Sequence, residues 1–110
     1  MTIARFKDLC VDAGDPARLG TFWAAASDRT LETKDGSYLL TGPTPRHIIW
    51  VNKVPEAKTV KHRVHWDVTV PDVALLVEAG ATLLREPDAD IGWHVLSDPE
   101  GNEFCAFTVA

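Results

Sequence analysis

Two segments of the sequence carry side chains that can bind a metal ion or move a proton, and in both segments these side chains recur at every second position. They are Asp8, Cys10 and Asp12 in the first segment, and His65, Asp67 and Thr69 in the second. Alternate residues of a β-strand point to the same face of a sheet. An imidazole on such a face can ligate a metal, act as a general base or donate a hydrogen bond. The alternative for His65 is a structural histidine whose ring is bonded to a neighbouring strand.

The first half of the chain shows the pattern of a strand, a helix and three further strands. Polar and apolar residues alternate over 7–12, which predicts the first strand. Asp15 and Pro16 form a good helix start, because aspartate caps the first turn and proline fits its first position. Apolar residues then follow at helical spacing: Leu19, Phe22, Trp23 and Ala26. Strands are predicted at 30–33, 37–41 and 48–51, with a hairpin turn at 34–36.

The second half shows the same order of elements. A strand over 63–70 contains His65, and a helix over 72–79 follows it, with Asp72 as its cap and Gly80 at its end. Three more strands are predicted at 81–85, 92–96 and 103–109. The turn at 98–102 contains proline, glycine and asparagine, which favour tight turns.

An internal repeat relates the two halves. When residues 8–19 are set over 65–76, three pairs coincide: Val11 with Val68, Asp15 with Asp72, and Leu19 with Leu76. We therefore expect a single domain over 1–110, built from a module of about 1–57 and a module of about 58–110. Each module has the order βαβββ, so the predicted fold class is α+β with two cupped mixed sheets. The open sheet faces are too polar for a sealed core and are typical of a cavity lining.

Composition restricts the partners and the compartment. The chain has 16 acidic and 11 basic residues, a net charge of -5, which argues against a nucleic-acid partner. The one basic cluster is Lys58, Lys61, His62 and Arg63. We interpret this cluster as a solvated linker, with contact to an anionic ligand or a second subunit as the alternative. Since the sequence shows neither a signal-peptide core nor an apolar run near the ~20 residues of a membrane span, we expect no membrane partner and a cytoplasmic location.

Three stretches resemble a known family. They are VDAGDPARLGTFW at 11–23, VPEAKTVKHRVHWD at 54–67 and HVLSDPEGNEFC at 94–105. In this order and spacing they are similar to glyoxalase-like domains of the vicinal-oxygen-chelate superfamily, which includes glyoxalase, bleomycin resistance and dioxygenase proteins. The resemblance implies the paired βαβββ fold of that superfamily. It implies function less directly, because the superfamily contains metal-dependent lyases, epimerases and dioxygenases as well as metal-free proteins that sequester a drug.

The resemblance also implies where a metal would bind. Metal-dependent members take ligands from the first and last strands of each module, and His65 matches one of these positions. Asp8 occupies the equivalent place in the first module, and Cys105 stands where the usual glutamate would be, with Glu103 two residues earlier on the same face. We therefore predict His65 and Glu103 as catalytic residues and as candidate ligands of a divalent metal such as zinc, with no metal as the alternative. Cys105 then behaves as a small hydrophobe and Glu103 pairs with a basic residue at the rim.

Two functions follow from these residues and the resemblance. The first is a small-molecule lyase or isomerase with His65 as its key polar group. The second is a metal-free protein that sequesters a ligand or an antibiotic without catalysis. The predicted ligand-binding residues are Asp8, Asp12, Trp50, Asp67, Trp93 and Cys105. Trp50 and Trp93 are expected to line the cup, with core or dimer-interface packing as the alternative, whereas Trp23 and Trp66 are expected in the core. The resemblance and the open sheet edges imply a homodimer.

Overall fold

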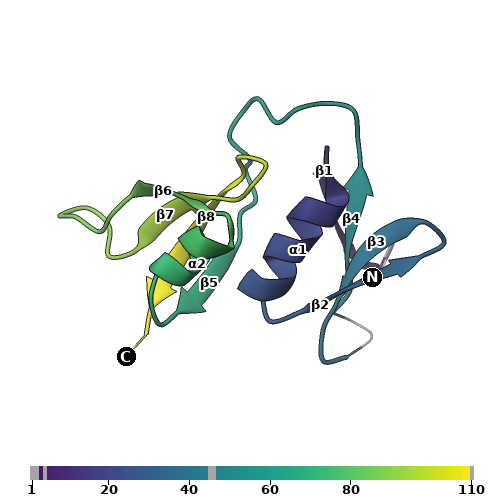
Figure 1. Cartoon of the computed structure of the whole chain (residues 1–110), viewed down its shortest axis with the longest axis horizontal. Coiled ribbons are helices and arrows are strands. Elements are labelled where there is room, and N and C mark those ends of the chain that lie inside the picture. The colour runs from purple at the N-terminus through teal and green to yellow at the C-terminus, as the bar shows by residue number, and fades with distance from the viewer. Residues whose placement is uncertain (1–2, 4, 45–46, 110) are drawn as a thin grey trace.

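The computed structural model describes residues 3, 5–44 and 47–109. The first half contains β1 (Leu9–Ala13), α1 (Pro16–Ala26), β2 (Thr30–Lys34), β3 (Ser37–Thr41) and β4 (Ile49–Lys53). The second half contains β5 (Asp67–Val70), α2 (Ala74–Ala79), β6 (Thr82–Arg85), β7 (His94–Ser97) and β8 (Glu103–Thr108). Figure 1 shows the two halves side by side, joined by the long segment that follows β4. The order βαβββ occurs in each half, as the internal repeat predicts.

Each half forms a mixed sheet of four strands. The strand order is β1-β4-β3-β2 in the first sheet and β5-β8-β7-β6 in the second. In both sheets the first and last strands of the module pair in parallel, and the other pairs are antiparallel. The fold class is therefore α+β, with two βαβββ modules, and the prediction from the repeat is confirmed.

The aspartates aligned by the repeat play similar local roles. Asp15 is the N-cap of α1, where its Oδ1 accepts a hydrogen bond of 3.1 Å from the Arg18 amide. The prediction that Asp72 caps the second helix is wrong, because α2 begins at Ala74 with Val73 as its N-cap. Asp72 lies one residue earlier, where its Oδ1 accepts a hydrogen bond of 2.9 Å from the Ala74 amide. Gly80 ends α2 with a φ of 126°, a conformation that favours glycine.

One hydrophobic core extends through both halves. Its members on the helix-covered faces of the sheets include Leu19, Leu40, Val51, Leu96 and Phe104, all no more than 2% exposed. Residues between them in the strands point to the opposite, open faces. The two sheets therefore share a core on their helix side and keep separate open faces.

Helix α1 joins the halves through an aromatic cluster. The Trp23 ring stacks on Trp66 at 4.0 Å between centroids, and it meets the Phe104 edge at 5.0 Å. Phe22 also contacts Phe104, with centroids 5.8 Å apart. Trp66, expected in the core beneath the second helix, is half-buried and stacks on α1 instead. Its partner belongs to the other module, which strand periodicity alone does not reveal.

The strand predicted over 63–70 begins only at Asp67. His65 and Trp66 precede β5, although the Trp66 carbonyl still accepts a hydrogen bond of 3.0 Å from the Cys105 amide. The elements predicted at 81–85, 92–96 and 103–109 start or end within two residues of their predicted bounds. No helix in the described part of the chain is long and apolar enough to cross a membrane.

Candidate functional site

The open face of the second sheet brings together His65, Asp67 and Cys105. Asp67 and Cys105 are paired across the parallel strands β5 and β8, so both side chains project from the same face. His65 lies two residues before Asp67, and its Nε2 is 3.3 Å from Asp67 Oδ1. One ligand atom from each of the three residues lies within 4.8 Å of the other two. An imidazole, a carboxylate and a thiol are therefore close enough to act on one bound group.

A cavity of about 380 Å³ adjoins these residues, and we call it the His65 cavity. Its lining combines apolar and polar side chains: Lys61, His65, Leu84, Arg85, Ile91, Trp93, Val95, Glu103, Phe104 and Cys105. Trp93 is half-buried, packs against Phe107 with ring centroids 5.7 Å apart, and donates a hydrogen bond to Cys105. The cavity thus offers an aromatic surface together with groups that can exchange protons. This composition is typical of small-molecule sites.

Glu103 lies on the same face but is engaged by the linker between the modules. Its carboxylate forms an ion pair with the Lys61 ammonium. The hydrogen bond from Lys61 holds the pKa of Glu103 below its usual value. Glu103 is therefore an ionised residue that lines the His65 cavity and is already paired with Lys61.

The thiol of Cys105 is protonated at neutral pH. Burial raises its pKa, and the negative charge of Asp67 raises it further because a second anion beside a carboxylate is unfavourable. Cys105 is half-buried, whereas the other cysteine, Cys10, is exposed. In this state Cys105 is a weak nucleophile, so the chemistry of the cavity centres on the imidazole and the carboxylates.

The predicted site residues of the first module lie on the first sheet, away from the His65 cavity lining. Trp50 donates a hydrogen bond of 3.0 Å to Asp8, so the structure brings these two together. Lys7, Trp50 and Cys10 all donate to Asp8, and these hydrogen bonds, with that of Lys7 the largest, hold the pKa of Asp8 below its usual value. Asp12 is exposed on β1, on the same face as Trp50 of β4. Within one chain, the predicted residues therefore form two groups, one on each sheet.

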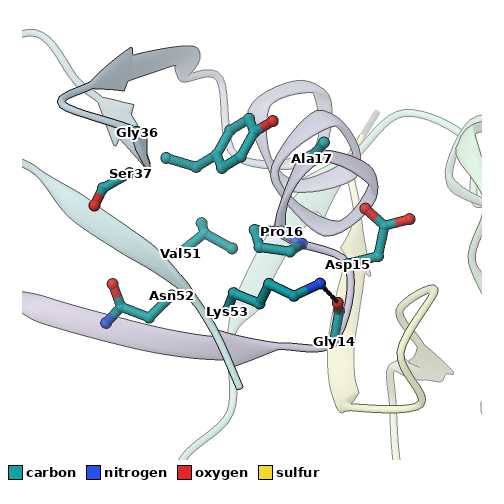
Figure 2. A pocket seen from close by; sticks show the side chains of 10 residues that line it. Gly14, Asp15, Pro16, Ala17, Gly36, Ser37, Val51, Asn52 and Lys53 are labelled. Carbon is teal, nitrogen blue, oxygen red and sulfur yellow. Dashed lines mark hydrogen bonds between the residues drawn. The ribbon is translucent and has the colours of Figure 1, made fainter. Parts of the chain in front are cut away.

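A larger cleft of about 680 Å³ lies at the start of α1, against β3 and β4 (Figure 2). Lys53 spans it and donates a hydrogen bond of 3.4 Å to the Gly14 carbonyl. A helix N-terminus is a natural anion site. Here, however, the Gly14 and Asp15 amides, which precede α1, already donate hydrogen bonds to the two carboxylate oxygens of Glu100, at 2.8 and 2.7 Å. The protein itself supplies the anion, so we place the functional site at the His65 cavity.

Sequence reasoning missed the role of the turn at 98–102. Asp98 is only 4% exposed and accepts four hydrogen bonds of 2.9 Å, including one from the Trp23 indole of α1. Together with the contacts of Glu100, this fastens the turn of the second module onto the first. The acidic residues of this turn look like ordinary turn formers in the sequence. Their partners belong to the first module, and only the three-dimensional structure shows this.

Comparisons with known proteins agree with this architecture. The sequence model of the glyoxalase-like domain matches residues 8–107. Among curated proteins, none matches the chain significantly. A glyoxalase/bleomycin resistance protein/dioxygenase family enzyme from Burkholderia phytofirmans PsJN superposes with a TM-score of 0.66 at 21% identity, covering 94% of this chain and 97% of that one.

Among the solved structures with a similar fold, some are named for a resistance function. The fosfomycin resistance protein FosX from Mesorhizobium loti superposes with a TM-score of 0.66 at 13% identity, covering 99% of this chain and 95% of that one. A hypothetical protein from S. aureus gives a TM-score of 0.69 at 14% identity, covering 98% and 96%. Identities this low establish the fold alone. With the family match over residues 8–107, the chain belongs to the glyoxalase-like domain family.

Proposed function

We propose that the chain binds a small, largely apolar molecule in the His65 cavity and that His65 and Glu103 act on it as acid–base groups of a lyase or isomerase. The observation that supports this most is the composition of the cavity. Trp93 and aliphatic side chains line the same space of about 380 Å³ as the His65 imidazole, the Glu103 carboxylate and the Cys105 thiol. Such a volume suits a compact organic ligand.

The wall of the cavity favours a flat or branched apolar group. Trp93 is supported from behind by Phe107, so its ring presents a rigid surface. Leu84, Ile91 and Val95 complete the wall. A ligand that fills this space would place its polar end near His65, where the reacting bond would lie.

The His65 imidazole is the first proposed acid–base group. Asp67 Oδ1 lies 3.3 Å from His65 Nε2, which fixes the ring and leaves Nδ1 to accept or donate a proton at the ligand. Glu103 is the second proposed group. Its carboxylate would exchange a proton with the ligand only after parting from Lys61, so we expect ligand binding to displace that lysine.

Binding can be tested by NMR on isotopically labelled protein. The probes are a set of small aromatic fragments together with fosfomycin and bleomycin, because relatives in the fold are named for resistance to these compounds. We expect shift changes confined to Trp93, Val95, Glu103 and Cys105, and at least tenfold weaker binding in Trp93→Ala. The matched control is Tyr38→Ala, which removes a half-buried aromatic ring from the helix-covered face of the first sheet. Shift changes around the α1 cleft, or no binding by any probe, would contradict the proposal.

Sequestration without catalysis is the second candidate, and the Lys61–Glu103 ion pair favours it. A carboxylate held by an ammonium is a poor general base, which leaves the cavity with a single free acid–base group. Mass spectrometry of a bound probe recovered after incubation separates the two functions. An unchanged compound indicates sequestration, whereas a product that is formed by the wild type and absent with His65→Ala indicates catalysis.

We also propose that the protein is a homodimer. The open sheet faces remain uncovered in one chain, and the radius of gyration of 14.9 Å exceeds the about 13 Å expected for this length. A second copy could place the open face of its first sheet, which carries Asp8 and Asp12, over the His65 cavity on the second sheet. Light scattering should give twice the mass of 12.1 kDa. A monomer at micromolar concentration would contradict the dimer.

A further inference from the structure

We infer that the cleft between the start of α1 and strands β3 and β4, called the α1 cleft, binds a second small molecule. The expected ligand is a zwitterion with a compact apolar body, of which a free aromatic amino acid is the simplest example. The cleft has a volume of about 680 Å³, against about 380 Å³ for the His65 cavity. The described residues that line it are all different from those of the His65 cavity, so the inference does not rest on the proposed function.

The floor of the α1 cleft is apolar and lies on the helix-covered face of the first sheet. Val51 is only 2% exposed, and Tyr38 is its cross-strand partner in β3, so both side chains point toward α1. Pro16 and Ala17, in the first turn of α1, continue the apolar lining (Figure 2). Tyr38 is half-buried against the core, so part of its ring is open to the cleft. A flat apolar group can pack on this ring in an offset stack.

Two opposite charges lie beside this floor. Lys53 follows Val51 at a spacing of two residues and therefore projects from the same face of β4. Its ammonium donates a loose hydrogen bond of 3.4 Å to the Gly14 carbonyl, and among the described residues it forms no ion pair. Asp15 lines the cleft with an exposed carboxylate. Within the described chain only its Oδ1 accepts a hydrogen bond, from the Arg18 amide.

The surroundings favour a ligand that carries both charges. The helix N-terminus itself is not an anion site, because the Gly14 and Asp15 amides are bonded to Glu100. Glu100 also adds a second carboxylate on this side, so a simple anion would meet two negative charges and one positive charge. A zwitterion avoids this repulsion. Its carboxylate pairs with Lys53 and its ammonium with Asp15, while its apolar body covers Tyr38.

Titration of the full-length protein with L-phenylalanine, followed by NMR, tests the inference. We expect shift changes at Gly14, Gly36 and Val51, which line the cleft. Benzoate and phenethylamine each carry one of the two charges. They should bind about fivefold more weakly or worse, as expected for the loss of one exposed ion pair. The uncharged aromatic fragments used for the His65 cavity should leave the signals of the α1 cleft unchanged.

Two variants remove the charges one at a time. Lys53→Gln and Asp15→Asn should each weaken L-phenylalanine binding about fivefold or more. Asparagine caps a helix about as well as aspartate, so Asp15→Asn should leave the circular dichroism spectrum unchanged. The matched controls are Lys34→Gln and Asp35→Asn, the same changes at two exposed residues of the neighbouring hairpin that do not line the cleft.

The outcomes are distinct. An absence of shift changes with L-phenylalanine, or changes confined to the His65 cavity, would overturn the inference. Equal weakening by the control variants would do the same, as would benzoate or phenethylamine binding as tightly as L-phenylalanine, because one charge would then be enough.

Trp93→Ala separates this site from the proposed function, since it should weaken fragment binding and leave L-phenylalanine binding unchanged. Fragment binding without L-phenylalanine binding would refute the α1 cleft site alone. L-phenylalanine binding in the cleft without fragment binding would refute the proposed function alone.

Discussion

The buried carboxylate of Asp98 gives the sharpest prediction about stability. Its Oδ1 accepts the Glu100 and Asn102 amides, and its Oδ2 accepts the Trp23 indole and the Asn102 side chain, all at 2.9 Å. In Asp98→Asn one of the two oxygens becomes an NH₂ group. Whichever way the new amide is turned, two donors then face a donor.

The expected cost follows from those two donors. A buried polar group left without its partner costs about 1–3 kcal/mol, so the pair gives about 2–6 kcal/mol. Because the Asn102 side chain can turn aside, we expect the lower part of this range, about 2–4 kcal/mol. A domain of this size is stable by about 5–15 kcal/mol in total. The melting temperature should therefore fall by about 10 °C or more.

Urea denaturation followed by circular dichroism measures this loss. The matched control is Asp35→Asn, the same chemical change at an exposed turn residue whose φ of 51° asparagine also accepts. That control should stay within about 0.5 kcal/mol of the wild type. If Asp98→Asn unfolds within about 1 kcal/mol of the wild type, the four hydrogen bonds do not fasten the turn as described here.

Three further changes test the same structure. Glu100→Gln keeps one acceptor for two amides, so we expect the unfolding free energy in urea to fall by about 1–2 kcal/mol. An unchanged urea midpoint would contradict the role of Glu100 in holding the turn to the first module. Gly80→Ala forces a side chain into a φ of 126° and should lower the unfolding free energy by about 1 kcal/mol or more, with loss of helix signal as the readout. Phe104→Ala empties a fully buried site beside Phe22 and Trp23, and calorimetry should show a loss of about 3–5 kcal/mol.

Local periodicity was enough to predict the elements and their order. Alternation identified the strands, and Asp15 marked the start of α1 as its cap, because these signals depend on neighbours in the chain. Asp72 marked the start of α2 only to within two residues, since Val73 is the N-cap there. The internal repeat then predicted two matching modules. Alternation predicted that His65 and Asp67 would share a face, and their side chains do lie 3.3 Å apart, although His65 precedes β5.

Contacts between the modules could not be predicted in the same way. Glu100 binds the Gly14 and Asp15 amides 86 and 85 residues away, and neither end carries a distinctive pattern. The same limit applied to Glu103, whose face was predicted but whose partner Lys61 lies 42 residues earlier, in the linker. Distant partners of this kind decide which of the acidic residues near His65 is already held in an ion pair.

The segment 98–105 combines features that local sequence patterns predict with contacts between the modules that they do not. Asp98, Asn102 and Phe104 are buried, while Glu103 and Cys105 project from the open face. The turn is held by Trp23 and by the first turn of α1, so the first module fixes where β8 begins. Because β8 positions Cys105 opposite Asp67, the first module sets the geometry of a site whose lining residues all lie at 61–105. Substitutions in α1 that loosen this turn should therefore weaken fragment binding in the His65 cavity without touching any residue that lines it.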